Sequence, residues 1–435
     1  MAEKTHITSI DENTAYWYLI NMADTLHHEV TPELKGAAKE RAEQLSLMMT
    51  RLATRLVFPS EDSGPHLDAL EGGLDKESIN HDGAILDAEQ AVVDELMASI
   101  AGKAGPQARE ADPARIEVYL KSIEAGGPAT KVTAAKLLAG GRSKATFKVS
   151  QSGARDLPDD LIIRQDWAGS VTGATVVSEY EMLRKLHAHG VKAPQPFALE
   201  TGSDALGAPF MIVAAVRGAC IGGIFDPPRD EALALQAAEQ MAAFHRISCA
   251  EFEACEGLIE RSYTAEQLSA ELDAIEGIVK SLEGENVTLH AAFDWLWRHI
   301  ADVKGPRVLV HGDLGFHNFL VEGGTLSAVL DWEFAHLGNP AEDLGYVRSW
   351  AEQMTDWETF LRAYREAGGL KTDKTSVDFF TLWSGLRIYH FLMQARAGIT
   401  SGKVRDPELT HISLELAPML AHRISRELRR IVSDE

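Results

Sequence analysis

The chain has 435 residues, 45% of them hydrophobic, so it is long enough for two or three domains with substantial cores. Its formal net charge of −23 argues against a nucleic-acid partner, whose phosphates would be repelled. No apolar run approaches the roughly 18 residues of a membrane span, no signal peptide is recognisable, and the three cysteines lack metal-ligand spacing, so we expect a cytoplasmic protein.

Residues 1–112 form an acidic segment that we expect to fold into a separate all-α domain. They contain 9 lysine and arginine residues against 21 aspartate and glutamate residues, a net charge of −12. Apolar residues recur at helical spacing over 13–26, 32–57 and 84–100. The domain is interpreted as a module for dimerisation or for docking a protein partner, and the alternative is a scaffold that packs on the rest of the chain.

Residues 113–213 are predicted to form a small β-rich unit. Extended apolar runs predict strands at 132–138, 145–149, 161–164 and 209–213. The connection between the first two strands contains Gly140, Gly141 and Ser143. Glycines let the backbone approach a ligand and direct N–H groups at phosphate oxygens, although a plain hairpin turn is the alternative. An amphipathic helix is predicted over 177–186.

Residues 214–435 are predicted to form a larger, mainly helical unit. The apolar spacing of 232–245 indicates a buried helix, and we expect His245 at its end to be satisfied within the protein. Residues 379–399 carry too many apolar side chains for one narrow stripe, which favours a central helix. Arg387 in this run needs a partner, and a carboxylate of the protein is favoured over a phosphate or carboxylate of a substrate.

The most informative stretch is His311-Gly-Asp-Leu-Gly-Phe-His-Asn318, which is followed by Asp331. Between them, residues 319–321 and 326–330 read as two strands joined by a glycine-containing turn. Pairing these strands as a hairpin brings Asn318 and Asp331 to the same end. A histidine, glycine and aspartate alone could be an ordinary loop, but the complete pattern disfavours that interpretation.

These residue types match what phosphoryl transfer from a metal–nucleotide requires. Asp313 can accept the proton of an attacking hydroxyl group. Asn318 and Asp331 can hold magnesium, because hard divalent cations prefer oxygen ligands. We therefore interpret the stretch as a kinase signature.

Together with Gly338-Asn-Pro-Ala-Glu-Asp-Leu-Gly345, this signature resembles the aminoglycoside phosphotransferase and choline-kinase-like superfamily. The resemblance begins near residue 113. It implies an α+β, bilobal protein-kinase-like fold that phosphorylates small-molecule hydroxyl groups, with 113–213 as the N-lobe and 214–435 as the C-lobe. It further implies Asp313 as the catalytic base, and His311 and Asp343 as residues that support the catalytic loop. For Asp343, an aspartate at the start of a helix is the alternative.

The resemblance also implies a nucleotide site in the N-lobe. In kinases a basic residue on the third strand grips the phosphates and is paired by a helix glutamate. Arg164 and Glu179 occupy these places, although the family usually has lysine on the strand. A guanidinium keeps its charge and can bind both phosphate and carboxylate. Lys148 is a second candidate for phosphate contact, for which a solvated strand face is the favoured interpretation.

Arg164 and the glycine-rich loop resemble one branch in particular, the kinase domains found fused or linked to acyl-CoA dehydrogenases. This resemblance implies a hydroxyacyl-CoA or related hydroxylated metabolite as acceptor. The expected phosphate donor is ATP with Mg²⁺, and GTP is the alternative nucleotide. Two other hypotheses stay open. One is an antibiotic kinase of the aminoglycoside type, whose polycationic substrates an acidic surface would attract. The other is a nucleotide-binding pseudo-kinase that acts through partners.

Overall fold

A computed structural model describes residues 12–26, 39, 42, 49, 112–138, 144–166, 175–223, 226–253, 255–283, 286–400 and 407–434. The chain divides into two compact units. One comprises Met1–Ala108, Ile278–Glu285 and Ile388–His422, and the other comprises Arg109–Gly277, Asn286–Arg387 and Arg423–Glu435. No helix in the described part is both long and apolar enough to cross a membrane.

The first unit contains α1 (Glu12–Thr25), which confirms the first helix predicted for the acidic segment. Ile20 and Ala23 lie on its buried side. The helices predicted over 32–57 and 84–100 lie outside the described residues, apart from three single positions. The docking or dimerisation role of this segment stays a prediction.

The second unit contains a five-stranded antiparallel sheet in the order β1-β2-β3-β5-β4. Its strands are β1 (Lys131–Leu137), β2 (Lys144–Ser152), β3 (Asp160–Asp166), β4 (Pro196–Glu200) and β5 (Phe210–Ala214). Four strands confirm the predicted ones, whereas β4 was not predicted because its five residues show no alternation. The helix α5 (Pro113–Ser122) was also missed, although Asp112 as N-cap and Pro113 in the first turn were a legible start signal.

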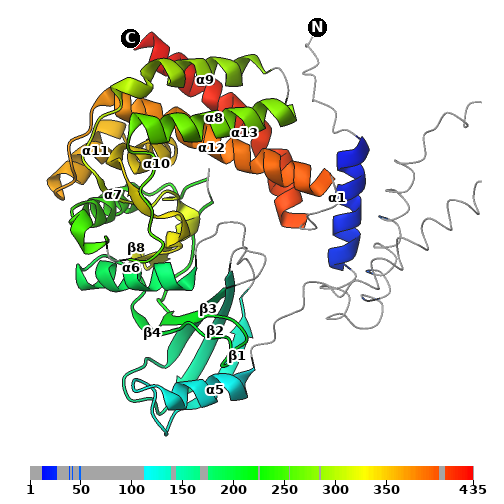
Figure 1. Ribbon diagram of the computed structural model, residues 1–435, viewed down its shortest axis with the longest axis vertical. Helices are drawn as coiled ribbons and strands as arrows, with labels where there is room; N and C mark the ends of the chain where they lie inside the picture. Colours follow the sequence, from blue (N-terminus) through cyan, green and yellow to red (C-terminus); the bar gives the residue numbers. More distant parts are fainter. Residues whose placement is uncertain are drawn as a thin grey trace, which may run out of the picture. The chain divides into compact units, whose positions relative to one another are not determined.

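The two faces of the sheet have different neighbours. Leu161 and Ile163 of β3 belong to a buried apolar cluster that includes Ile116 and Leu120 of α5. Figure 1 shows α5 lying along the sheet. Because side chains alternate along a strand, Arg164 points to the opposite face, where α6 (Val176–Ala188) contacts β3, β4 and β5. The sheet thereby separates an apolar layer from a charged one.

The rest of the second unit is mainly helical. It draws on α7 (Glu231–His245), α8 (Ala265–Glu283), α9 (Val287–His299), α10 (Pro340–Met354), α11 (Trp357–Glu366), α12 (Lys374–Thr400) and α13 (Pro407–Ser433). The helices α7 and α12 confirm the predictions for 232–245 and 379–399. Aromatic side chains fill much of this core, and Phe244 packs edge-on against Trp332 with their ring centres 5.1 Å apart.

A close contact between two helices of this core depends on a glycine. A Cβ atom on Gly345 of α10 would lie 2.5 Å from the carbonyl carbon of Phe380 and 2.6 Å from the nitrogen of Thr381, both in the backbone of α12. We expect Gly345→Ala to lower the free energy of unfolding by about 1–3 kcal/mol, because the helices must move apart. Urea denaturation measures this change.

The matched control for this substitution is Gly277→Ala in α8, where nothing lies within 4 Å of the added methyl group. There alanine should stabilise the protein by about 0.5–1 kcal/mol, since it favours the helix. If both variants shifted stability alike, the close contact between α10 and α12 would have no energetic significance.

Candidate active site

The loop that carries Asp313 follows a short buried strand. The strand β6 (Val308–Val310) pairs with β9 (His336–Gly338), and all three of its residues are buried. The chain then turns at Gly312, whose φ of +80° is left-handed, and a Cβ atom there would lie 3.0 Å from the carbonyl oxygen of Phe334. This turn presents Asp313 just beyond the strand.

A buried carboxylate, Asp343, holds this turn. Its Oδ2 accepts the N–H of His311 at 2.8 Å, and its Oδ1 accepts the N–H of Gly312 at 2.9 Å. The Nε2 atom of His245 lies 3.0 Å from Oδ2, so this histidine is satisfied within the protein, as predicted. Asn339, rather than Asp343, caps α10. Asp343 therefore makes the contacts expected of a carboxylate that braces the loop.

His311 is buried and holds the same loop from the other side. Its Nε2 atom lies 2.9 Å from the carbonyl oxygen of Leu330, and its Nδ1 accepts the N–H of Asp313 at 3.2 Å. Burial lowers its pKa, although nearby carboxylates oppose the shift. A neutral ring with its proton on Nε2 satisfies both contacts.

Three side chains surround the carboxylate of Asp313. The hydroxyl group of Tyr346 donates to Oδ1, the amide of Asn318 donates to Oδ2 at 3.0 Å, and Nε2 of His317 lies 3.1 Å from Oδ2. Burial alone would raise the pKa of Asp313, but the contacts with His317 and Tyr346 outweigh it and lower the pKa to about 2. The carboxylate is thus ionised at neutral pH and able to accept a proton.

The predicted hairpin is present as β7 (Phe319–Glu322) and β8 (Thr325–Val329). The N–H of Leu330 donates to the carbonyl of Asn318 at 2.8 Å, which brings the two ends of the hairpin together. Asp331 follows with a left-handed φ of +59° and a side chain that is 39% exposed.

The donor chemistry of Asn318 and Asp331, an amide and a carboxylate, fits a hard divalent cation. Among the described residues, no group of three or more His, Cys, Asp or Glu side chains could hold a metal ion. Magnesium sites in proteins commonly combine one or two carboxylates with nucleotide phosphates and water.

Arg164 connects the sheet to this end of the hairpin. It donates to Glu179 of α6, the pairing that the sequence predicts, and its Nη2 lies 2.9 Å from Oδ1 of Asp331. Burial alone would lower the pKa of Arg164, but Glu179 and Asp331 raise it, so the guanidinium keeps its charge. Asp331, which is predicted to bind metal, is thus an ion-pair partner of Arg164, which is predicted to bind phosphate.

Three residues next to these side chains were not predicted from the sequence: Tyr346, His317 and Lys144. Tyr346 lies three residues after Asp343, and positions three apart share a helix face, so this spacing could have indicated it. His317 lies inside the signature, but no role was predicted for it. Lys144 was assigned to the end of a loop, but it begins β2 and is buried.

Two other predictions about the nucleotide site have different outcomes. Gly140, Gly141 and Ser143 lie outside the described residues, so their contact with nucleotide stays a prediction. Lys148 has a side chain that is 48% exposed and lies 3.3 Å from Asp160. It occupies the solvated strand face that the sequence favours for it.

Arg387 of α12 is paired within the protein. It donates to Oε1 of Glu342 at 2.9 Å and to the carbonyl of Gly312. The pairing with a protein carboxylate is confirmed, and a contact with substrate stays a prediction. Oε2 of Glu342 lies 2.9 Å from Nε2 of His336. A buried charge network therefore supports the loop beneath Asp313.

Glu342 should make the protein sensitive to acid. Burial alone would raise its pKa, but His336 and Arg387 lower it from 4.5 to about 2. A lowered pKa stabilises the fold above pH 4.5, and this contribution is lost as the pH falls towards 2. In Glu342→Gln, the loss of unfolding free energy between pH 7 and pH 3 should be smaller by about 2 kcal/mol.

Urea denaturation at the two pH values measures this difference. Glu322→Gln is the control, because Glu322 is an exposed carboxylate at the end of β7. It should leave the pH dependence unchanged. An unchanged pH dependence in Glu342→Gln as well would show that another group controls acid unfolding.

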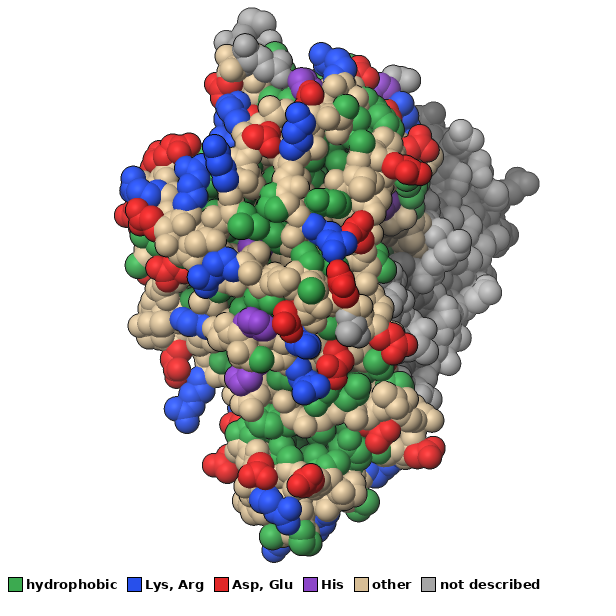
Figure 2. Space-filling view, turned by 60° about the vertical axis from the view of Figure 1, so that its left-hand side comes forward, with side chains coloured by type: hydrophobic (Ala, Val, Ile, Leu, Met, Phe, Trp, Pro, Cys, Tyr) green, Lys and Arg blue, Asp and Glu red, His purple; other side chains and the backbone are tan. Residues whose placement is uncertain are grey.

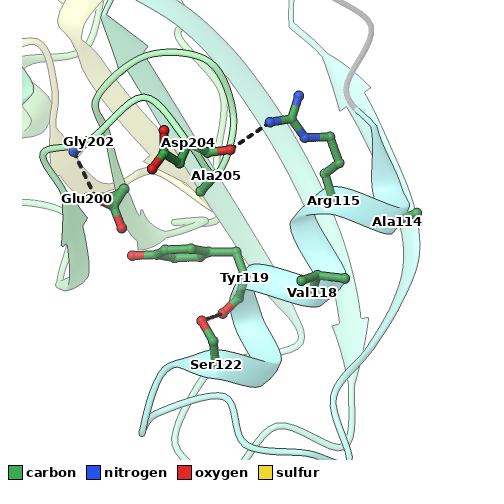
Figure 3. Close-up of a pocket in the computed structure, with 9 residues that line it drawn as sticks. All are labelled: Ala114, Arg115, Val118, Tyr119, Ser122, Glu200, Gly202, Asp204 and Ala205. Carbon is green, nitrogen blue, oxygen red and sulfur yellow. Dashed lines mark hydrogen bonds between the residues drawn. The ribbon is translucent and has the colours of Figure 1, made fainter.

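A separate pocket of about 600 Å³ lies between α5 and the segment that follows β4 (Figure 3). Arg115 donates there to the carbonyl of Asp204 at 2.9 Å, and the ring of Tyr119 extends towards Glu200. None of the predicted site residues lines this pocket. It is therefore distinct from the site around Asp313.

A model of the phosphotransferase enzyme family matches residues 134–380, which is more than half of the chain. The chain belongs to this family. The matched region runs from β1 to the first part of α12 and contains Asp313, Asn318, Asp331 and Arg164. The family's reaction class, phosphotransfer, is the one that the signature predicts.

The phosphotransferase is also similar to parts of larger proteins. It is 24% identical over 248 residues to acyl-CoA dehydrogenase family member 11 of Pongo abelii, and 23% identical over 247 residues to the Homo sapiens protein of that name. Each match covers 54% of this chain but only 30% of the relative. The similarity agrees with the branch that the sequence resembles.

Solved structures confirm the predicted fold. A putative aminoglycoside phosphotransferase from Ralstonia eutropha JMP134 has a TM-score of 0.56 at 18% identity, covering 73% of this chain and 98% of that one. The GDP complex of an aminoglycoside 2′-phosphotransferase-IIIa mutant has a TM-score of 0.52 at 20% identity, covering 71% and 96%. The kinase-like α+β architecture is therefore shared.

Proposed function

We propose that this phosphotransferase transfers the γ-phosphoryl group of ATP to a hydroxyl group of a small molecule, with magnesium as cofactor. GTP is the alternative donor. The observation that carries the proposal is the position of Asp313 beside the hairpin. Its Oδ2 accepts the amide of Asn318 at one end of the hairpin, and Asp331 follows the other end. Arg164 extends from the sheet to the same place.

Each of these residues has a defined task in the proposed reaction. Asp313 orients the acceptor hydroxyl group and receives its proton. Arg164, held by Glu179, contacts the nucleotide phosphates. Asn318 and Asp331 would hold magnesium, which when bound neutralises charge on the transferring phosphoryl group. Because the transition state is loose, positioning and charge neutralisation are the main contributions of the protein.

The proposed acceptor is a hydroxyacyl-CoA or a related hydroxylated metabolite. Similarity to acyl-CoA dehydrogenase family member 11 supports this class. An aminoglycoside is the second candidate, since proteins of the same fold are named for such substrates. Figure 2 shows acidic and basic side chains interspersed over one face, without a continuous acidic patch among the described residues there. That mixture gives little support to a polycationic substrate.

Mass spectrometry can test the acceptor directly. The protein is incubated with Mg-ATP and a mixed panel of hydroxyacyl-CoAs, aminoglycosides and simple alcohols. We expect a phosphorylated hydroxyacyl-CoA. A phosphorylated aminoglycoside would replace the proposed acceptor class, and nucleotide binding without any product would favour the pseudo-kinase hypothesis.

The metal site can be tested through binding. Asp331→Ala is expected to weaken magnesium-dependent binding of a fluorescent ATP analogue by at least about tenfold, because a cation ligand is lost. Binding without magnesium should not weaken, since the substitution also releases Arg164. Glu322→Ala, which removes an exposed carboxylate from the same hairpin, is the control. Equal magnesium dependence in both variants would contradict the assignment of Asp331.

A further inference from the structure

Lys144 is a buried cation at the edge of the candidate active site. In the pairing of β2 with β3, Thr146 is opposite Arg164, and Lys144 lies two residues before Thr146 on the same strand face. The Lys144 side chain is 1% exposed. Burying an ammonium group is costly unless it is paired, so its partners matter.

The partners of Lys144 include two carboxylates from different parts of the unit. The Nζ of Lys144 lies 3.7 Å from Oε2 of Glu179 on α6 and 3.6 Å from Oε2 of Glu333. Glu333 follows two residues after Asp331, in the turn that leaves the hairpin. Lys144 therefore ties the beginning of β2 both to α6 and to the segment of the predicted metal ligand.

The ion pairs of these residues form a chain of alternating charges. Its order is Asp331, Arg164, Glu179, Lys144, Glu333. Glu179 is the shared member, with one oxygen facing each cation. Three carboxylates and two cations leave a net charge of −1.

We propose that Lys144 is a positioning residue that neutralises Glu179 and Glu333, so that Arg164 can exchange Asp331 for the nucleotide phosphates. The proposal rests on the nucleotide-binding function inferred above. Magnesium bound to Asp331 would neutralise much of the charge that attracts Arg164 and so weaken this ion pair. Without Lys144, the negative charges of Glu179 and Glu333 would be less neutralised. They would then attract the guanidinium of Arg164 more strongly and compete with the nucleotide phosphates for it.

Lys144→Met tests this role, because methionine keeps much of the side-chain volume and removes the charge. The dissociation constant of a fluorescent ATP analogue with magnesium should rise about tenfold. In steady-state assays with an acceptor, KM for ATP should rise much more than kcat falls. Lys144→Arg should retain binding, since it keeps the charge. The control is Lys148→Met, on the same strand and face but exposed.

A double variant separates positioning from direct phosphate contact. In Lys144→Met with Glu333→Gln, the uncompensated carboxylate is removed together with the lysine, and charge balance is restored. We expect this variant to recover most of the lost nucleotide affinity. Affinity that stays as low as in Lys144→Met would overturn the proposal, because Lys144 would then act on the phosphates itself.

Two further measurements complete the test. Thermal unfolding of each variant checks that the fold persists, and the charge-balanced double variant is the one expected to remain folded. If Lys144→Met is folded and binds nucleotide like the unmodified protein, the positioning role of Lys144 is overturned, but the proposed function is not. Absence of magnesium-nucleotide binding in the unmodified protein would overturn the proposed function, and this inference with it.

Discussion

Replacing Asp313 by asparagine is expected to lower kcat about a thousandfold, a typical loss when a positioned general base is removed. Asparagine keeps the shape of the side chain, but a neutral amide cannot accept the proton of the acceptor hydroxyl group. Nucleotide affinity should stay unchanged, because other residues are assigned to the phosphates and magnesium. A coupled assay for ADP gives kcat, and titration with a fluorescent ATP analogue gives the affinity.

The pH profile provides a second measurement for Asp313. With a pKa of about 2, this carboxylate is ionised throughout the range in which kinases are assayed. Asp313 should therefore give no acid limb of kcat/KM above its ordinary pKa of 3.8. An acid limb near pH 6 would have to arise from another group.

Asp302→Asn is the matched control for Asp313→Asn. Asp302 is 58% exposed, lies 3.4 Å from His299 and is not part of the signature. It should alter kcat by less than about twofold, as surface substitutions usually do. Retained turnover in Asp313→Asn would remove this residue from the role of base.

Asp343→Ala should produce the largest loss of stability. The backbone N–H groups of His311 and Gly312, together with the ring of His245, would lose their buried acceptor. Each unsatisfied buried donor costs roughly 1–3 kcal/mol, so we expect a total of about 4 kcal/mol. Urea denaturation measures this loss. Turnover should fall as well, because the loop that presents Asp313 loses its brace.

Asp230→Ala is an informative comparison for Asp343→Ala. Asp230 caps α7 by accepting the N–H of Ala232 at 3.0 Å, and losing such a cap costs about 1 kcal/mol. The same substitution is thus made at a helix end and in a buried network. If Asp343→Ala cost no more than Asp230→Ala, water would be replacing the carboxylate and the brace would be dispensable.

Local patterns predicted the elements around the site well. The hairpin between Asn318 and Asp331, the strand that carries Arg164 and the helix that carries Glu179 all have periodicities that depend on neighbouring residues alone. The strand β4 was not predictable in this way. It has no alternation because all five residues are partly buried, and its position at the sheet edge comes from pairing with β5.

The sequence by itself determined the signature that identifies a phosphotransferase. Asp313, Asn318 and Asp331 lie on one loop and one hairpin, where chain connectivity sets their proximity. Only the tertiary structure decided which charged side chains form ion pairs. Arg164 contacts Asp331, which is 167 residues away along the chain, and Lys144 pairs with both Glu179 and Glu333. Ion pairs and hydrogen bonds require separations of a few ångströms, and sequence spacing fixes such distances only within an element.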